Sequence, residues 1–503
     1  MAPKVARVRR RHGCMTCKAR HVRCDEQKPA CGQCTGTGRK CDGYAVNLSQ
    51  RQLRQNVLDA YQRQRSTCNP DTRMILPLGN AKEREYISLF STRTSLAMMG
   101  FFSSNFWGHL LPQLSHYEPV IRHAVAAVGA AHQQYRGLVP PGYTDVFILQ
   151  QYNKSIRLLV ENLSAATSTN LDLTLITCAL FVCLELLRGD YNRALDHIEA
   201  GLKILARPSP ALTSHSSDSQ IVYDELLEMF SRLDIELSSF ARTHKVLPSF
   251  TDPRTIMIPS RFMDIGEARR SLTALMNYSL TLFLHSGPLK SFAHGGSPQD
   301  PPWQKIVSQL PMIEQAYNAW LVSLQGLLES PDGASVGERA VLSLRIDHLL
   351  AVQWVFSTVR WEDVELDRWN GHLEEIVTLA ERLLLLDAST EPYFSLDNCA
   401  IRALQWTATT CSLPLVRRKA IQLLSAHPRQ ESLWIARRSA KIAEAMMNLE
   451  ETDQSSLPVE QRIPAFENRV TPFNFKDFAA TRKTHLYLIN GKGEHSILYV
   501  DWS

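Results

Sequence analysis

Six cysteines close to the N-terminus constrain this chain more than any other feature. They form two copies of the pattern C-x2-C-x6-C, and few large apolar residues lie among them. A segment of this kind has no hydrophobic core of its own. Closely spaced thiolates can bind structural zinc, and the free energy of zinc binding then stabilises the folded segment. We therefore predict a zinc-stabilised head with six ligands: Cys14, Cys17, Cys24, Cys31, Cys34 and Cys41.

The number of cysteines also predicts how many metal ions the head binds. Two separate four-thiolate sites need eight cysteines, but six can serve two tetrahedral zinc ions if two sulfurs bridge the metals. Two mononuclear sites would each need an outside ligand, for which His12 and His21 are candidates. A disulfide framework needs an oxidising compartment, and the Arg-rich start shows no secretory signal. The bridged cluster has no open coordination position, which argues against a zinc enzyme.

Charge is concentrated in the same part of the chain. Residues 1–45 carry 11 Lys/Arg and 3 acids, a net charge of +8, which leaves −3 for the other 458 residues. A basic head on a nearly neutral body suggests that the head binds a polyanion. The Arg-Val-Arg-Arg-Arg run at 7–11 is also typical of a nuclear-import signal.

The segment from Cys14 to Tyr44, with basic residues between its cysteines and Pro29 between its halves, closely resembles the fungal binuclear zinc-cluster transcription factors. The resemblance implies two zinc ions per chain, bridged by the first cysteine of each half, Cys14 and Cys31. It also implies a nuclear, sequence-specific regulator of RNA polymerase II genes whose partner is double-stranded DNA.

By this resemblance, the short helix between Cys17 and Cys24 enters the major groove at a CGG-like half-site. Arg and Lys pair with guanine O6 and N7, whereas a neutral imidazole such as His21 donates only one hydrogen bond. The other bases of the head either form a solvated surface or contact phosphates, which position a protein without reading sequence. The predicted DNA-binding residues are Lys18, Arg20, His21, Arg23, Lys28, Arg39 and Lys40.

Behind the head the chain changes character. Residues 46–80 are polar, with about two irregular turns of apolar spacing, so a weak coiled coil and a flexible linker both stay open, as do monomer and homodimer. Strand-like runs flank Asn490-Gly491 near the C-terminus and predict a β-hairpin. We predict a zinc-cluster domain at 1–45, a linker at 46–80, a large all-α regulatory domain at 81–450, and a tail at 451–503 with a hairpin at 485–500.

Apolar residues at helical spacing support the all-α prediction. The most apolar segment, Leu171–Leu187, contains Asp172 and Glu185 and predicts a buried helix instead of a membrane span. Helices are expected at 119–135, 146–163, 171–187, 191–205, 223–242, 265–285, 304–328, 338–358, 370–387, 399–410, 415–425 and 431–450.

Several body segments resemble the helical regulatory region that follows the zinc cluster in many of these regulators. They include Phe106-Trp107, Glu118–Ala124, Leu184–Tyr191 and Glu431–Trp434. No phosphate-binding glycine loop, nucleophile elbow or HExxH pair is found. We therefore expect the body to regulate activity or recruit the transcription machinery or co-regulators. The alternative is a ligand sensor whose body binds a small metabolite or sterol.

Residues 450–467 contain five acids, one base and several apolar residues. This composition is compatible with an acidic activation segment, but a surface loop is the simpler interpretation.

Overall fold

The chain divides between Ile75 and Leu76 into two units, described separately below. The computed structural model describes residues 16–17, 20, 22, 24–25, 27, 31–38, 41, 79–140, 142–165, 171–206, 217–241, 256–285, 301–359, 366–387, 391–478 and 481–503. The predicted linker at 46–80 lies outside the described residues except for Gly79 and Asn80.

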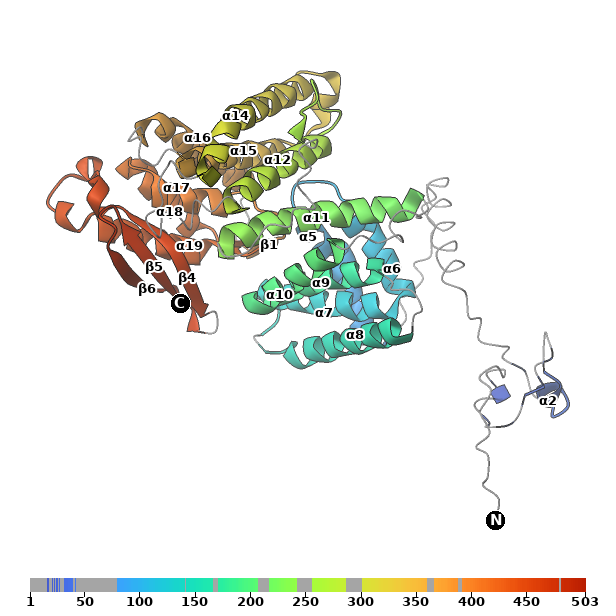
Figure 1. Cartoon of the computed structure of the whole chain (residues 1–503). Coiled ribbons are helices and arrows are strands. Elements are labelled where there is room, and N and C mark those ends of the chain that lie inside the picture. The colour runs from blue at the N-terminus through green and yellow to red at the C-terminus, as the bar shows by residue number, and fades with distance from the viewer. Residues whose placement is uncertain are drawn as a thin grey trace, which may run out of the picture. The chain divides into compact units, whose positions relative to one another are not determined.

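The second unit begins with a group of helices that pack around α7 (Figure 1). Asn80 and Glu83 form a reciprocal capping box at the start of α4, and Pro119 begins α7. The elements of this group are α4 (Ala81–Leu89), the π-helical η1 (Phe90–Thr94), α5 (Ser95–Met99), π-helical η2 (Phe106–Leu110), α6 (Leu111–Tyr117), α7 (Pro119–Tyr135), α8 (Asp145–Ala165), α9 (Leu171–Arg188), α10 (Tyr191–Leu205) and α11 (Ser217–Ala241).

The later helices form two further groups (Figure 1). Helices α12, α14 and α15 enclose a separate apolar core around Phe262 and Trp320, whereas α16 to α19 extend the main core. Their bounds are α12 (Ile265–His285), α14 (Pro301–Leu328), the 3-10 turn η6 (Pro331–Ser335), α15 (Glu338–Val359), α16 (Leu366–Leu386), α17 (Ile401–Thr410), α18 (Pro414–Ala426) and α19 (Ala436–Glu450).

The mostly helical body confirms the predicted fold class. Helices α7, α10 and α12 begin and end at the predicted residues, and most others differ by a few residues at each end. Leu171–Arg188 is a buried helix, as expected from its composition. Among the described residues, no helix is long and apolar enough to cross a membrane.

The close approach of α7 to α4 depends on Gly129. An added Cβ at this position would lie 2.4 Å from the carbonyl oxygen of Tyr86 in α4, and a backbone atom cannot turn aside as a side chain can. We expect Gly129→Ala to lower the free energy of unfolding by about 1–3 kcal/mol, the usual cost of overpacking. Thermal or denaturant unfolding of the full chain measures this.

The matched control is Gly371→Ala in α16, where no atom lies within 4 Å of the added Cβ. Because alanine favours helix over glycine, this variant should be neutral or more stable by up to about 1 kcal/mol. Equal destabilisation of the two variants would contradict the close packing of α7 on α4.

A small sheet that was not predicted lies among the helices of the body. Strand β1 (Tyr393–Ser395) runs parallel to β2 (Arg429–Glu431), which pairs antiparallel with β3 (Trp434–Ile435). The helix predicted at 431–450 therefore begins only at Ala436. The Glu431 carboxylate accepts three hydrogen bonds of 2.8–2.9 Å from the backbone N–H groups of residues 399–401, at the start of α17. These partners lie some thirty residues earlier, so local periodicity could not reveal the strand.

The C-terminal hairpin is confirmed and belongs to a larger sheet. Strands β5 (Lys483–Asn490) and β6 (His495–Asp501) pair antiparallel, and β4 (Val470–Phe478), which was not predicted, pairs antiparallel with β5. One face of this sheet packs on α19 through Ile442 and Met446. The burial of this face explains why the sheet forms on the helical body.

The acidic segment differs from both sequence interpretations at its start. Glu450 and Glu451 are buried and pair with Arg417 and Arg418 of α18. Short 3-10 turns follow at η7 (Thr452–Gln454), η8 (Val459–Gln461) and η9 (Phe466–Asn468). Two of the five acids are thus structural, which removes them from any exposed activation surface.

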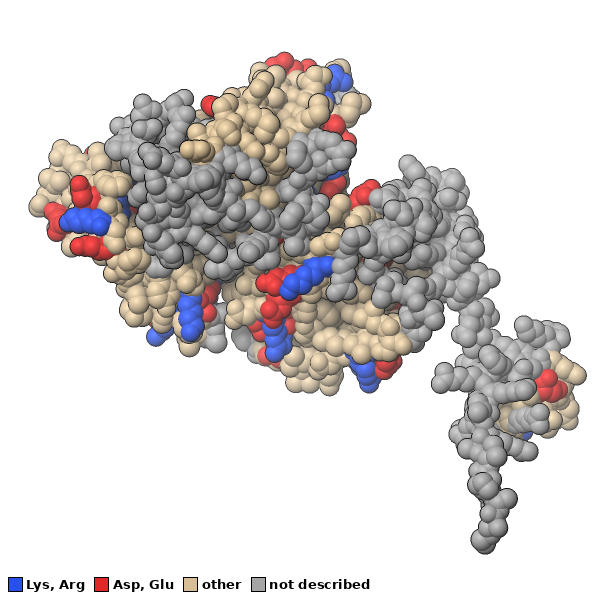
Figure 2. All heavy atoms as spheres, in the orientation of Figure 1, with Lys and Arg blue, Asp and Glu red and all other residues tan. Residues whose placement is uncertain are grey.

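Charged residues of both signs are mixed on the surface of the body. On the face in Figure 2, described Lys and Arg side chains lie next to Asp and Glu, and surface pairs such as Lys203–Glu199 are only 3.1 Å apart. This mixing agrees with the small net charge of the body in the sequence. The described residues of this face form no extended basic patch.

Candidate zinc centre and nucleic-acid interface

The described cysteines of the head form two groups that share one member. The Sγ atoms of Cys17, Cys24 and Cys31 lie within 4.8 Å of one another, as do those of Cys31, Cys34 and Cys41. Cys17, Cys31 and Cys34 are fully buried. The sixth cysteine, Cys14, lies outside the described residues. Sequence repeats 14–24 and 31–41 thus converge on one small thiol cluster.

The spacing of these thiols fits zinc. Zn–S bonds of about 2.3 Å place the sulfurs of one tetrahedron about 3.8 Å apart. The Sγ atoms of Cys17 and Cys31, which belong to the same thiol group, are 3.6 Å apart. A donor set of thiolates only is typical of a structural site, and no other group of three potential ligands is found among the described residues.

A carboxylate supports the second half of the cluster. Asp25 follows Cys24 directly, and its Oδ2 accepts a hydrogen bond of 2.8 Å from the backbone N–H of Gly32, at the start of helix α2 (Gly32–Thr35). An added Cβ on Gly32 would lie 2.6 Å from that oxygen, so a larger residue would shift the Asp25 carboxylate. The pair therefore ties the first repeat to the helix that carries Cys34.

The first half of the head is described at only a few residues. Thr16 and Cys17 are helical, and the Arg20 N–H donates to the Thr16 carbonyl at 3.2 Å. Arg20 lies in a turn, and neither Val22 nor Cys24 is helical. The other residues between Cys17 and Cys24 lie outside the described part of the chain, so the predicted helix there stays a prediction.

Only one predicted DNA-binding residue lies within the described part of the head. Arg20 is half-buried beside the cysteine cluster, and its Nη1 atom is buried. The other predicted contacts lie outside the described residues: Lys18, His21, Arg23, Lys28, Arg39 and Lys40. Their positions relative to DNA therefore stay predictions.

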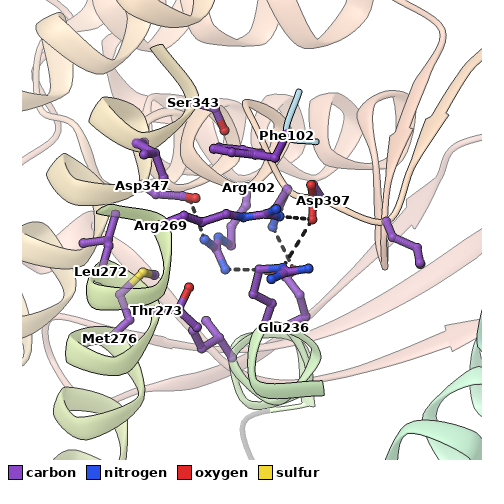
Figure 3. Close-up of a pocket in the computed structure, with 15 residues that line it drawn as sticks. Phe102, Glu236, Arg269, Leu272, Thr273, Met276, Ser343, Asp347, Asp397 and Arg402 are labelled. Atoms are coloured by element: carbon purple, nitrogen blue, oxygen red, sulfur yellow. Dashed lines mark hydrogen bonds and ion pairs between the residues drawn. The ribbon is translucent and has the colours of Figure 1, made fainter. Parts of the chain in front are cut away.

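The body contains a buried charged cluster that sequence reasoning missed (Figure 3). Arg402 of α17 lies at its centre, with Nη1 2.5 Å from Glu236 of α11 and Nη2 2.8 Å from Asp347 of α15. Glu236 also accepts hydrogen bonds from the Trp434 indole at 2.6 Å and the Asn398 amide at 2.8 Å. No local pattern marks these residues, because each partner comes from a distant helix or loop.

A second part of the cluster surrounds Asp397. This carboxylate pairs with Arg269 of α12 and lies 3.4 Å from Nε of Arg232 in α11. The Arg269 guanidinium also stacks over the Phe102 ring, 4.0 Å from its centroid. Burial raises the pKa of Asp347 to about 6, although the neighbouring Arg402 opposes the shift.

The cavity among these residues encloses about 40 Å³. A water molecule occupies about 30 Å³ of liquid, whereas ligand pockets usually enclose 300–1,000 Å³. The charged groups that line the cavity also pair with one another (Figure 3). The ion pairs around the cavity therefore join several helices, and the cavity itself has no room for a metabolite or sterol.

Comparison with known proteins finds one family model that matches the head and another that matches part of the body. Residues 12–51 match the model of the fungal Zn(2)-Cys(6) binuclear cluster domain, and residues 85–286 match that of the fungal specific transcription factor domain. No solved structure matches the chain.

Curated relatives are fungal regulators. The chain is 24% identical to the aspercryptin biosynthesis cluster-specific transcription regulator atnN of Emericella nidulans over 77% of its own length and 66% of the relative. It is 30% identical to the transcription regulator lscL of Purpureocillium lilacinum over 38% of its length and 49% of the relative. The transcriptional regulatory protein moc3 of Schizosaccharomyces pombe is 44% identical over 55 residues. The chain thus spans about half to two thirds of the first two relatives.

A cluster of thiols on a basic head, followed by a helical body, defines a zinc-cluster protein of the DNA-binding class. Such a cluster binds two zinc ions, the number predicted from the six cysteines. The chain therefore carries two domains of fungal transcription factors, a Zn(2)-Cys(6) binuclear cluster domain at 12–51 and a fungal specific transcription factor domain at 85–286. These families and relatives are regulators and not enzymes, which sets the zinc-enzyme alternative aside.

Proposed function

We propose that this chain is a nuclear, sequence-specific regulator of RNA polymerase II genes whose head reads CGG-like half-sites. The observation that supports it best is the position of Cys31 in both thiol groups, as expected for a bridged two-zinc cluster. The matches to both fungal regulator domains add to this support. The excess of basic residues in the head favours DNA as its partner.

In this proposal the six cysteines have one role and the bases between them another. The six cysteines would hold two zinc ions, with Cys14 and Cys31 shared between them and the other four each contributing to one. Bound zinc supplies the cross-links that hold the two repeats together, since the segment lacks a core of its own. The Asp25 carboxylate holds the second repeat against the first through the Gly32 N–H.

The bases then act on DNA in two ways. Lys18, Arg20, His21 and Arg23 lie near base edges, where Arg and Lys suit guanine. The remaining bases, Lys28, Arg39 and Lys40, contact phosphates and set the orientation of the head. Nuclear import depends on the Arg-rich run at 7–11, and the body recruits co-regulators or the transcription machinery.

Binding-site selection with the zinc-loaded full chain tests this function. We expect enrichment of sites with a CGG half-site, and Arg20→Ala should weaken binding to the selected site about 10-fold or more, since a good base contact contributes about 1–3 kcal/mol. Affinity should also fall steeply with salt.

The matched control is Lys492→Ala, which removes a base from an exposed turn of the C-terminal sheet. This variant should bind the selected site as the unchanged chain does. Enrichment of sites without any CGG would contradict the proposed half-site, and failure to enrich any sequence would contradict sequence-specific binding.

A further inference from the structure

The C-terminal sheet ends in a strand with an open edge. Strand order is β4-β5-β6, so among the described residues β6 has a strand neighbour on one side only (Figure 1). Val500 of β6 faces the core on α19, whereas Ile497 and Tyr499 are 48% and 67% exposed. Long, exposed, apolar edge strands tend to pair with another chain.

Two backbone hydrogen bonds show which residues of β6 point to this edge. Trp502 N–H donates to the Arg482 carbonyl at 2.9 Å, and Asn490 N–H donates to the Glu494 carbonyl at 3.0 Å. Because antiparallel pairs alternate, even-numbered residues of β6 bond to β5. The backbone groups of the odd-numbered residues therefore point outward: His495, Ile497, Tyr499 and Asp501.

These four residues can pair with the same four residues of a second β6 strand that runs in the opposite direction. If a second β6 runs antiparallel with residue 498 at the two-fold axis, Ile497 lies opposite Tyr499 of the other copy. His495 then lies opposite Asp501 of that copy, so an imidazole meets a carboxylate. Aromatic–β-branched and polar cross-strand pairs of this kind stabilise sheets. Shifting the register by two residues in either direction leaves one end residue without a partner.

We propose that β6 is a homodimer interface, where it pairs antiparallel with β6 of a second copy about a two-fold axis at Leu498. The two sheets become one continuous six-stranded sheet, in which the β6 edge of each copy is covered. On the outer face, the row of rings formed by Phe478, His485 and Tyr499 then packs against Ile497 of the second copy. The self-complementary order favours a second copy over an unrelated peptide strand.

Charge exchange at one cross-strand pair tests this interface in the full chain without DNA, which keeps the test independent of the proposed half-site. We expect the unchanged chain to sediment as a dimer, and both Ile497→Lys and Tyr499→Glu to sediment as monomers. Combining the two substitutions places each lysine opposite a glutamate and should restore the dimer.

The matched control is Ile463→Lys, at a residue 52% exposed and outside the sheet, which should leave the dimer unchanged. A monomeric unchanged chain, a dimer that persists in the single variants, or a monomeric chain carrying a foreign peptide on β6 would each overturn the proposal. Near-native melting temperatures confirm that the single variants fold.

Cross-linking tests the register separately. In the proposed register, residue 498 lies directly opposite residue 498 of the other copy. The two form a non-hydrogen-bonded pair, in which the Cα atoms are close together. Leu498→Cys should therefore form a disulfide-linked dimer on mild oxidation. Ser496→Cys faces Val500 of the other copy and should not cross-link to itself. Equal cross-linking of both variants, or of neither, would contradict the axis at Leu498.

Discussion

Replacing Cys31 with alanine is expected to cost the head both zinc ions and its specific DNA binding. Cys31 belongs to both thiol groups, so its loss opens both coordination spheres at once. Structural zinc sites contribute about 10–16 kcal/mol of apparent binding free energy, which a head without a core cannot replace. We expect metal analysis to show less than one zinc per chain instead of two. Specific binding should fall by about 10³-fold or more, to the non-specific level.

A buried cysteine of the body provides the control. Cys178 lies in α9, where burial raises the pKa of its thiol to about 11, and it belongs to neither thiol group of the head. Cys178→Ala should therefore keep two zinc ions. The body of the Cys31→Ala chain should also unfold at its usual temperature. Two zinc ions retained in the Cys31→Ala chain would contradict the shared position of this thiolate.

Replacing Arg417 with methionine is expected to destabilise the body by about 3–5 kcal/mol. Arg417 and Glu450 are 0% and 1% exposed, with Nη1 2.6 Å from Oε2. The Arg417 Nε also donates to the Ala408 carbonyl at 3.0 Å, and Glu450 accepts from Val470 N–H at 2.9 Å. Without the guanidinium, a buried carboxylate remains with no opposing charge, and the junction of α17, α18 and β4 weakens. Denaturant or thermal unfolding measures the loss.

Two further variants show whether the buried charge is the cause. Adding Glu450→Gln to Arg417→Met removes the unpaired charge, so the double variant should be more stable than Arg417→Met. Arg157→Ala removes one partner of an exposed pair, Arg157–Glu161, and should change stability by less than about 1 kcal/mol. If the Arg417→Met variant were as stable as the Arg157→Ala variant, the buried ion pair would not contribute to stability as proposed.

Helices with a strong local signal could be predicted almost to the residue. In α7, Pro119 at the first position and an apolar stripe reaching toward Tyr135 define both ends. Helix α10 begins after Asp190, whose side chain accepts from the Arg193 N–H, and α9 ends at Gly189 with a positive φ of 76°. These signals lie within a few residues of the ends that they mark.

The zinc cluster could be predicted for a different reason. Its ligands lie within 28 residues, and their spacing alone brings the two repeats together. The contact between Asp25 and Gly32 was not predicted, although both residues were visible in the segment. An aspartate after a cysteine and a glycine after the next cysteine are too common for the sequence to identify the pair.

Long-range contacts could not be predicted from one sequence. Arg402 meets Glu236, which lies 166 residues earlier, and Glu431 caps a helix that begins 30 residues before it. In each case the local residues resemble ordinary helix or loop positions. The strand β4 was missed because its pairing with β5 and its burial on α19, not its own composition, define it.

The position of Glu236 has a consequence for how this kind of protein is divided. The recognisable family segment ends at 286, yet Glu236 in that segment binds Arg402 and Trp434, which lie beyond it. A chain cut at 286 would keep a buried carboxylate and lose the cation and the indole that solvate it. The segment that matches the family model, residues 85–286, is therefore smaller than the compact unit in which it folds, residues 76–503. Substitutions at Arg402 or Trp434 can therefore destabilise the segment at 85–286 through their contacts with Glu236.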